Sequence, residues 1–486
     1  YAFTITLSTF LAGIALGSLA FARLNRSRSE IVSNPLALAA VVAVLICLGL
    51  LLSLTLAGRL PWWFLEGYKA GLADSFFIFQ AFIFLMSFAV MILPTFFMGL
   101  LFPAVTVAWT RHAETAGQGV GTAYAINTVG TIFGALLGGL LILPWLGIQH
   151  SVQMAAGLYL LGALLFWLPG SQGMKTVTRG VAVASVTVVT VLVAFNLPSW
   201  NRSVMAGGVF HSVASISEWT ERASLEEVMA GSKMLFYAEG QDGIVVVEEN
   251  DGQRYLIING KTDATDVGDM PTQVMMGQLP VMMHPGAANA LVIGLGSGVT
   301  AGSLATHPGF SDITVLELSR EVVEASAFFN HVNRDVLSDA RVKIVEADAR
   351  NFMLATNETY DLVVSQPSNP WLSGVSNLFT TEFFEMARSR LAPGGLMTQW
   401  VQIYKMSEDD LKTLLHTFGS VFPKVSIWHP QGGDLILIGS AESHAMDAAV
   451  VGNRMAQPEV LKDLRRIGIH SVRDMVRMFA MDRERL

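Results

Sequence analysis

The chain has 486 residues, of which 52% are hydrophobic and 14% charged, with a mean hydropathy of +0.48. This composition is too apolar for a soluble enzyme, and the net charge of −8 excludes a basic surface for nucleic acid. The lone Cys47 excludes a disulfide framework and a cysteine-based zinc site, and the length allows two or three domains.

Six apolar stretches each approach or exceed the roughly 20 residues that span a bilayer. They predict a multi-pass α-helical membrane domain over residues 1–197. The stretch 75–110 is too long for one simple crossing, so a kinked helix, a strongly tilted helix or two crossings remain open. The chain opens inside an apolar segment without Met, so we expect further residues upstream. The predicted helices are 1–23, 35–58, 75–110, 120–146, 150–169 and 178–197.

Glycines recur at every fourth residue in the fourth of these stretches, at Gly130, Gly134 and Gly138. This spacing predicts close packing against another helix, and a transport path is the alternative. We find no clear intramembrane pair of acid and base, which most ion-coupled transporters need.

The second half of the chain has a different pattern. Residues 198–233 read as a polar linker, and residues 234–282 as a small β-rich subdomain with a hairpin across Asn250-Asp-Gly252. Strands and helices alternate through 283–440, which predicts a Rossmann-like α/β domain with helices on both faces of a parallel sheet. Residues 441–486 read as a charged helical tail.

The segment Leu291–Thr300 carries the strongest functional signal. An apolar strand runs directly into Gly294, Gly296 and Gly298, and about 20 residues later a second strand ends in Glu317. Glycine lets the backbone pass close to a ligand, and an acid at the next strand end can accept hydrogen bonds from ribose hydroxyls. These features predict a nucleoside site.

Two later strand ends extend this site. Asp348 follows the third strand, where it could accept a hydrogen bond from an adenine amino group, and Ser365-Gln-Pro-Ser-Asn-Pro-Trp371 follows the fourth. No Lys-Ser/Thr pair follows the glycines, so a phosphate-binding P-loop is excluded. The pattern fits a nucleoside without pyrophosphate, such as an adenosyl sulfonium.

The span from about 235 to 440 resembles the spermidine synthases (polyamine aminopropyltransferases), which have the class I methyltransferase fold. The resemblance rests on Leu256–Gly260, Gly277–Pro285, the glycine turn, Asp348-Ala-Arg and Leu391-Ala-Pro-Gly-Gly395. The whole chain is similar to membrane-fused, transporter-like members of that family. The resemblance implies that Gly294, Gly296, Gly298, Glu317 and Asp348 bind decarboxylated S-adenosylmethionine, or S-adenosylmethionine itself.

The family places catalytic acids after the fourth strand, where this chain has Gln366 and Asn369. Amides can orient an amine but cannot take its proton. Asp269 survives from the family's substrate stretch, and with Asp263 and Asp266 it could hold a cationic acceptor or supply a base; a solvated turn is the alternative.

Two aromatic residues complete the expected site. Trp371 and Tyr404 could line the substrate pocket by cation–π contact or serve in packing. His284 and His416 have no ligand partners at metal spacing, so we expect no metal.

Loop charges and cofactor supply give opposite predictions of sidedness. Arg23, Arg26 and Arg28 mark the first loop as cytoplasmic, and Lys175 and Arg179 suggest the same for the loop before the last helix. With one crossing at 75–110 the synthase-like domain lies outside the cytoplasm. With two crossings it lies inside, as cofactor supply favours. We expect an inner-membrane protein with a cytoplasmic synthase-like domain.

Three functions follow. The first is transfer of an aminopropyl or other alkyl group from the sulfonium to a small-molecule amine or other acceptor. The second is methyl transfer to a membrane-delivered acceptor. The third is a non-catalytic subunit or transporter with a degenerate nucleoside domain. We expect the lipid bilayer as a partner, no nucleic acid, and a homo-oligomer or membrane complex as open possibilities.

Overall fold

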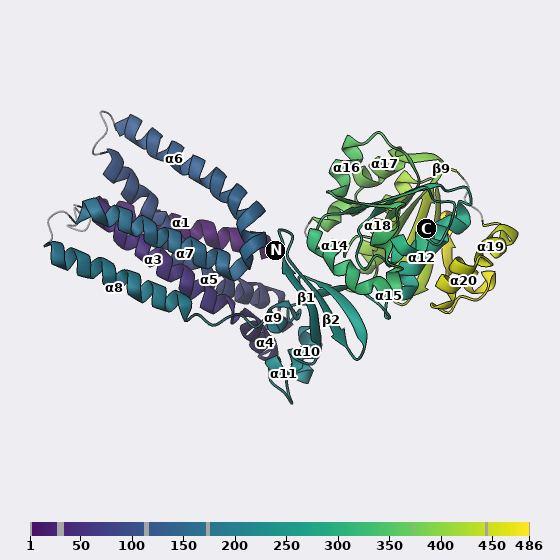
Figure 1. Ribbon diagram of the computed structural model, residues 1–486, viewed down its shortest axis with the longest axis horizontal. Coiled ribbons are helices and arrows are strands. Elements are labelled where there is room, and N and C mark those ends of the chain that lie inside the picture. Colours follow the sequence, from purple (N-terminus) through teal and green to yellow (C-terminus); the bar gives the residue numbers. More distant parts are fainter. Residues whose placement is uncertain are drawn as a thin grey trace. The chain divides into compact units, whose positions relative to one another are not determined.

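The computed structural model describes residues 2–26, 34–110, 116–171, 175–372, 374–442 and 446–485. Arg28, one of the basic residues expected on the first loop, lies outside these ranges. The chain divides into two compact units, Tyr1–Gly231 and Ser232–Leu486 (Figure 1). Each unit has hydrophobic clusters of its own.

The N-terminal unit is helical. Within the described ranges, five continuous helical stretches are long and apolar enough to cross a membrane. One of them is the 55-residue path Ala116–Gly170, which Gly147 breaks with a non-helical φ of 72° and ψ of 174°. The break separates the two helices predicted at 120–146 and 150–169. The long helices are α1 (Ala2–Arg26), α3 (Pro35–Ala57), α5 (Phe76–Thr110), α6 (Ala116–Leu137), α7 (Leu143–Gly170) and α8 (Thr176–Phe195).

α5 is one helix of 35 residues, so the alternative of two crossings at 75–110 is wrong. Pro94 lies inside α5 and has no N–H to donate to the carbonyl of Val90. The hydroxyl of Ser53 on α3 donates to that carbonyl instead, at 2.6 Å. A neighbouring helix therefore satisfies the backbone group that the proline leaves free, and α5 continues.

α1 and α5 lie side by side and run in the same direction. Gly13 lies against Thr95, and further along both helices Phe21 clusters with Ala104. α3 runs the opposite way, because its C-terminal half meets the middle of α5 at Ser53 while its earlier residues cluster with the later part of α5. The chain therefore crosses this bundle once in each of the three helices.

The bundle has two ends. At the first end, Asn34 before α3 donates to the carbonyl of Gly170 at the end of α7, at 2.6 Å. At the second end, the indole N–H of Trp200, after α8, donates to the carbonyl of Leu54 at the end of α3, at 3.0 Å. The described basic residues of the first end are Arg23, Arg26, Lys175 and Arg179.

Residues 198–231, most of the span 198–233 predicted as a polar linker, belong to the N-terminal unit. Their buried apolar side chains, such as Val204 and Ile216, cluster with Phe64 of α4 and Met86 of α5. The sequence gives little sign of this packing, because the apolar residues of 198–231 are few and lie in short helices. These helices are α9 (Arg202–Ala206), α10 (Val213–Trp219) and α11 (Leu225–Met229), and α4 spans Leu60–Lys69.

The C-terminal unit opens with a four-stranded antiparallel sheet in the order β1-β2-β3-β4. The predicted hairpin across Asn250–Gly252 is confirmed as the β2–β3 turn, with positive φ at Asp251 and Gly252. One face of the sheet packs on the helix that follows β6. The strands are β1 (Lys233–Glu239), β2 (Ile244–Asn250), β3 (Gln253–Ile258) and β4 (Lys261–Thr265).

An eight-stranded sheet forms the centre of this unit, in the order β12-β10-β11-β9-β8-β5-β6-β7. The five neighbours from β9 to β7 are parallel, and β11 is antiparallel to both β9 and β10. This is the Rossmann-like, methyltransferase-type domain that the alternating pattern predicts. The strands are β5 (Asn289–Ile293), β6 (Asp312–Glu317), β7 (Val342–Glu346), β8 (Tyr360–Ser365), β9 (Leu391–Gln402), β10 (Lys424–Gln431), β11 (Asp434–Ser440) and β12 (Phe479–Asp482).

Helices cover both faces of this sheet (Figure 1). Alternate residues of β5 and β8 enter two separate cores, because successive side chains of a strand point to opposite faces. One core takes helices α12 (Met270–Met283), α13 (Val299–Leu304), α19 (Ala448–Met455) and α20 (Pro458–Arg465). The other takes α16 (Ala349–Ala355), α17 (Thr381–Ser389) and α18 (Glu408–Val421).

Two elements fall where the sequence predicts something else. The buried helix α12 occupies residues 270–283, all but the last of which fall in the span 234–282 predicted as a β-rich subdomain. The predicted helical tail contains β12, which pairs with β10 at the sheet edge. β12 has only four residues, mostly exposed, so no alternating pattern marks it.

Glycines pack helices together, but at other positions than the predicted stripe. An added Cβ at Gly17 would lie 1.9 Å from the carbonyl oxygen of Phe96. At Gly130, Gly134 and Gly138 it would meet nothing within 4 Å. Among the described residues, α1 therefore packs closely on α5 through a glycine, whereas Gly130, Gly134 and Gly138 make no such close approach.

We predict that Gly17→Ala destabilises the helical unit while Gly134→Ala does not. The added methyl group collides with backbone at Gly17, and overpacking of this kind costs about 1–3 kcal/mol. Thermal unfolding of the detergent-purified protein measures the difference. Equal melting temperatures for the two variants would contradict the packing of α1 on α5.

Candidate nucleoside and acceptor site

The candidate site lies where the order of the parallel strands reverses. The chain passes from β5 outward through β6 to β7, and then returns to the other side of β5 with β8 and β9. Ligands of open α/β sheets bind outside the carboxyl ends of the strands at such a reversal. The glycine turn after β5 and residues 366–371 after β8 therefore face each other across the site.

The glycine turn depends on backbone that only glycine adopts easily. Gly294, Gly296 and Gly298 have φ values of 89°, 56° and 82°. An added Cβ at Gly294 would lie 3.0 Å from the carbonyl oxygen of Gln366, whereas at Gly296 it would meet nothing within 4 Å. The turn is therefore packed on the β8 side and open at Gly296, where a ligand can approach the backbone.

Glu317, at the end of β6, holds the turn from one side. Its carboxylate accepts hydrogen bonds from the backbone N–H groups of Leu295, at 2.9 Å, and Ser319, at 3.0 Å. Burial raises the pKa of Glu317 above the usual glutamate value, although these N–H groups act in the opposite direction. The backbone N–H groups of Leu318 and Gly296 also act on this carboxylate, which remains partly exposed toward the site.

Gln366, at the end of β8, holds the turn from the other side. Its amide N–H donates to the carbonyl oxygen of Gly294 at 2.7 Å, and its amide oxygen accepts from the hydroxyl of Thr300 at 2.6 Å. The sequence suggested that this side chain orients an acceptor. Both ends of the amide are instead bonded to the glycine turn and the helix behind it.

Asn369 is fully buried, and neither its amide nitrogen nor its amide oxygen has a hydrogen-bond partner. Its neighbour Ser368 donates to Asp263 at 2.6 Å. Two buried, unpaired groups on one side chain are costly, at about 1–3 kcal/mol each. Asn369, unlike Gln366, keeps its hydrogen-bonding capacity free.

The three aspartates of the predicted carboxylate cluster have separate partners. Asp263 pairs with Lys261 at 2.5 Å, and Asp266 accepts from His331 at 2.8 Å. Asp269 precedes α12 and accepts from the backbone N–H and the hydroxyl of Thr265. Burial raises the pKa of Asp269. Asp263 and Asp266 thus have basic partners, whereas Asp269, among the described residues, is hydrogen-bonded only by Thr265.

The remaining predicted residues lie at the rim of the site. Asp348 follows β7, is exposed, and caps α16 by accepting from the backbone N–H of Asn351 at 2.8 Å. Trp371 and Tyr404 meet edge to face, with ring centroids 5.8 Å apart, and each keeps about two fifths of its surface exposed. The two aromatic residues therefore form one surface beside the loop after β8.

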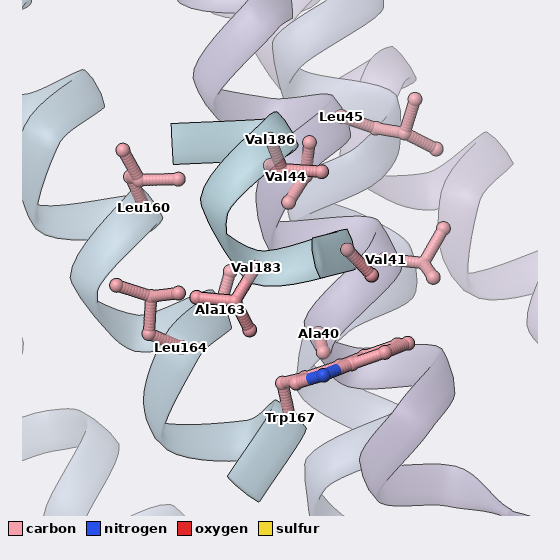
Figure 2. A pocket seen from close by; sticks show the side chains of 11 residues that line it. Ala40, Val41, Val44, Leu45, Leu160, Ala163, Leu164, Trp167, Val183 and Val186 are labelled. Carbon is pink, nitrogen blue, oxygen red and sulfur yellow. The ribbon is translucent and has the colours of Figure 1, made fainter. Parts of the chain in front are cut away.

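The N-terminal unit contains a pocket of another kind, shown in Figure 2. It lies among α3, α7 and α8 and is lined by aliphatic side chains such as Val44 and Leu160, with Trp167 at one edge. Without an acid, base or nucleophile, this pocket offers no chemistry. The candidate nucleoside site lies in the other unit.

Several residues of the site carried no sequence signal. Thr300 anchors Gln366, Lys261 neutralises Asp263, and His331 pairs with Asp266. Two of these three contacts join residues more than 60 positions apart, which only the folded chain brings together. Only the charge of Lys261, two residues before Asp263, could have suggested its role from the sequence.

Comparison with known proteins identifies the class of this domain. Residues 270–429 match the spermine/spermidine synthase domain. The chain is 27% identical over 190 residues to the polyamine aminopropyltransferase of Sodalis glossinidius, and 26% identical over 188 residues to the spermidine synthase of Dictyostelium discoideum. In each case the match covers 39% of this chain and 66% of the relative, which is just under two thirds.

A longer match links the chain to the polyamine aminopropyltransferase of Yersinia pestis, at 28% identity over 48% of this chain and 80% of that enzyme. Among solved structures, a spermidine synthase in complex with the transition-state analogue AdoDATO aligns at 18% identity, over 51% of this chain and 85% of that one, with a TM-score of 0.43. The spermidine synthase of Thermotoga maritima aligns with a TM-score of 0.42 and 18% identity, over 51% and 84%. Residues 270–429 of this chain thus match the spermine/spermidine synthase domain, as the motifs predict.

We predict that Gln366→Glu destabilises the C-terminal unit. A carboxylate cannot donate to the carbonyl of Gly294 and would be repelled by it, at a cost of about 1–3 kcal/mol. Gln241→Glu, at an exposed position, adds the same charge and should have little effect. Thermal melts of the two variants test this. Unchanged stability in Gln366→Glu would show that Gln366 does not hold the turn.

Proposed function

We propose that this protein transfers an alkyl group, in the first instance aminopropyl, from an adenosyl sulfonium to a small-molecule acceptor. The observation that carries the proposal is the glycine turn fixed between Glu317 and Gln366 at the strand reversal. Gly294 and Gly296 would lie under the nucleoside, Glu317 would accept from the ribose hydroxyls, and Asp348 would reach the adenine. The match to polyamine aminopropyltransferases supports this assignment.

Catalysis in this proposal is mainly alignment. The acceptor attacks the carbon next to the sulfonium, and the carbon–sulfur bond breaks with its electrons passing to sulfur. The leaving group departs as a neutral thioether, so it needs no acid. Holding two reactants in line supplies much of the rate enhancement of such a step. Trp371 and Tyr404 would cover the acceptor from the rim.

Methyl transfer from S-adenosylmethionine is the second candidate. Intact S-adenosylmethionine carries a carboxylate that needs a donor or cation, and no Arg or Lys lies in the glycine turn. We therefore favour the decarboxylated cofactor. A non-catalytic nucleoside sensor is the third candidate, and the amides after β8 are what favours it.

We predict that calorimetry shows tighter binding of decarboxylated than of intact S-adenosylmethionine, and that the affinity falls as the pH drops. Ribose hydroxyls donate best to the ionised carboxylate of Glu317. Because the pKa of Glu317 is raised, the affinity should fall at a higher pH than an ordinary glutamate would give. In the ligand-free protein, folding stability depends on pH in the opposite direction to the binding affinity. A carboxyl with a raised folded pKa contributes stability at low pH and loses it as the pH rises.

Glu317→Gln should bind the nucleoside about tenfold or more weakly, equivalent to about 1.4 kcal/mol or more, and lose this pH dependence. Glu385→Gln, on the exposed face of α17, is the matched control and should bind like the wild type. Equal affinity of the Glu317 variant at all pH values would remove Glu317 from the nucleoside site.

We also propose that the protein is a multi-pass membrane protein of the inner membrane, with the first end of the bundle in the cytoplasm. Five apolar helical stretches of sufficient length support the membrane assignment. Arg23 and Arg26 lie at the first end, and cytoplasmic loops are the ones enriched in such residues. The chain after α8 leaves the bundle at the second end, where Trp200 bonds to Leu54. The spermidine synthase domain then follows on the side away from the cytoplasm.

This arrangement differs from the cytoplasmic placement that cofactor supply suggests. The cytoplasmic alternative required residues 75–110 to cross twice, and α5 is a single helix. An adenosyl sulfonium made in the cytoplasm would therefore have to reach the opposite face of the membrane.

We predict that alkaline phosphatase fused after the last residue is active in intact cells, and that green fluorescent protein at the same position is dark. Fusions placed after Lys175, in the α7–α8 connection, should give the reverse pattern because that loop belongs to the first end. A fluorescent C-terminal fusion with inactive phosphatase would place the domain in the cytoplasm.

A further inference from the structure

Asp434 is a buried carboxylate at the start of β11, on the β8 side of the strand reversal. Its side chain accepts from the hydroxyl of Thr272 at 2.7 Å, the amide of Gln431 at 3.0 Å and the indole N–H of Trp400 at 3.1 Å. All three donors are neutral. Among the described residues, no Lys, Arg or His forms an ion pair with Asp434, although only 5% of this residue is exposed.

The helix α12 connects Asp434 to the glycine turn. Thr272, which donates to Asp434, lies in the first turn of this helix. The next residue, Gln273, accepts from the hydroxyl of Ser297 in the glycine turn, and its carbonyl oxygen accepts from Thr300 behind the turn. One step along the helix therefore separates the partner of Asp434 from the residue that contacts the nucleoside side of the site.

The strand β9 connects Asp434 to the loop after β8. Gln402 lies directly opposite Asp434 on the antiparallel pair β9–β11, so both side chains are on the same face of the sheet. The amide N–H of Gln402 donates to the carbonyl oxygen of Pro367 at 3.2 Å. Pro367 follows Gln366, which holds the glycine turn. Asp434 is thus connected to the turn from two sides, and it lies in the part of the site where the acceptor would approach.

Buried acceptor oxygens are in excess beside Asp434. Gln402 is fully buried, and its amide oxygen has no hydrogen-bond partner. The amide oxygen of Asn369, two residues after Pro367, is also buried and unpaired. An unpaired acceptor next to a buried carboxylate is costly unless a donor comes between them. A ligand with several N–H bonds supplies such donors, and an ammonium group has three.

The negative charge of Asp434 also has no structural purpose that a neutral side chain could not serve. An amide oxygen can accept hydrogen bonds from the same kinds of donor, and burying an uncompensated charge costs far more than burying an amide. Burial raises the pKa of Asp269, and the charge of Asp434 acts in the same direction. The two carboxylates therefore repel each other, and a cation bound between them would relieve the repulsion.

Aromatic rings border the same place. An added Cβ at Gly433, the residue before Asp434, would lie 3.4 Å from the ring of Tyr404. Tyr404 in turn meets Trp371 edge to face. The faces of such rings attract ammonium groups. The carboxylate, the unpaired amide oxygens and the rings thus favour the same kind of ligand group.

We propose that Asp434 binds the acceptor nitrogen and takes its proton, in a site that has amides and no acids at positions 366 and 369. This inference rests on the transfer function proposed above and names its base. The acceptor enters as an ammonium, one N–H proton passes to the carboxylate, and the freed lone pair attacks the carbon next to sulfur. The carbon–sulfur bond breaks with its electrons passing to sulfur, and the nitrogen takes the positive charge that sulfur loses. The proton on Asp434 then passes to water.

The test uses the full-length protein in detergent, decarboxylated S-adenosylmethionine and two probes of the same length at neutral pH. n-Butylamine is protonated at this pH and must lose a proton before it attacks, whereas O-propylhydroxylamine is already neutral. Release of the thioether nucleoside measures transfer. We expect Asp434→Asn to lower kcat/KM for n-butylamine by about a hundredfold or more and to leave kcat/KM for O-propylhydroxylamine nearly unchanged.

Asp409→Asn, at an exposed position of α18, removes the same charge and should change neither probe's kcat/KM. Calorimetry with the thioether nucleoside checks the fold, and Asp434→Asn should bind it like the wild type. If Asp434→Asn does not bind the nucleoside, Thr272→Val decides. This variant removes one hydrogen bond from the carboxylate, so kcat/KM should fall for n-butylamine by about threefold or more and stay unchanged for O-propylhydroxylamine.

An equal loss for both probes, or no loss for either, in the deciding variant would overturn the role of Asp434 and leave the proposed transfer intact. Wild-type protein that alkylates O-propylhydroxylamine and not n-butylamine would have the same meaning, because no ammonium would then be deprotonated. Wild-type protein that releases no thioether nucleoside with either probe would overturn the proposed transfer, and the role of Asp434 with it.

Discussion

The geometry of the site depends on one constraint, which is the anchoring of the glycine turn from two strand ends. The turn has three residues at positive φ, and the side chains at the two neighbouring strand ends hold its backbone. Glu317 accepts from the backbone of Leu295, and Gln366 donates to the carbonyl of Gly294. The amide donor of Gln366 and the carboxylate acceptor of Glu317 thus hold the backbone of the turn from opposite sides. The opening at Gly296 follows from this geometry.

The same constraint separates the roles of the two amides. Gln366 must donate to Gly294, so a carboxylate would not serve in its place. Asn369 holds no part of the turn, because neither the nitrogen nor the oxygen of its buried amide has a hydrogen-bond partner. The amide at position 366 therefore has a structural cause.

Sequence reasoning succeeded where the signal was local. The run from Leu291 to Gly298 predicts a strand and its turn, and the β2–β3 hairpin follows from Asp251-Gly252. It failed where contacts join distant residues. Nothing in residues 75–110 reveals that Ser53 replaces the hydrogen bond lost at Pro94, which keeps α5 in one piece. Likewise, the burial of residues near Ile216 in the first unit appears only once the chain has folded.

The central claim is that the anchored turn supports transfer and not binding alone. The direct measurement is mass spectrometry of the products after incubation with decarboxylated and intact S-adenosylmethionine and a mixture of amines. The account predicts an alkylated acceptor formed in equal amount to the thioether nucleoside, with both products absent from Glu317→Ala. Tight nucleoside binding by the wild type without any product, lost in Glu317→Ala, would contradict it and identify the domain as a sensor.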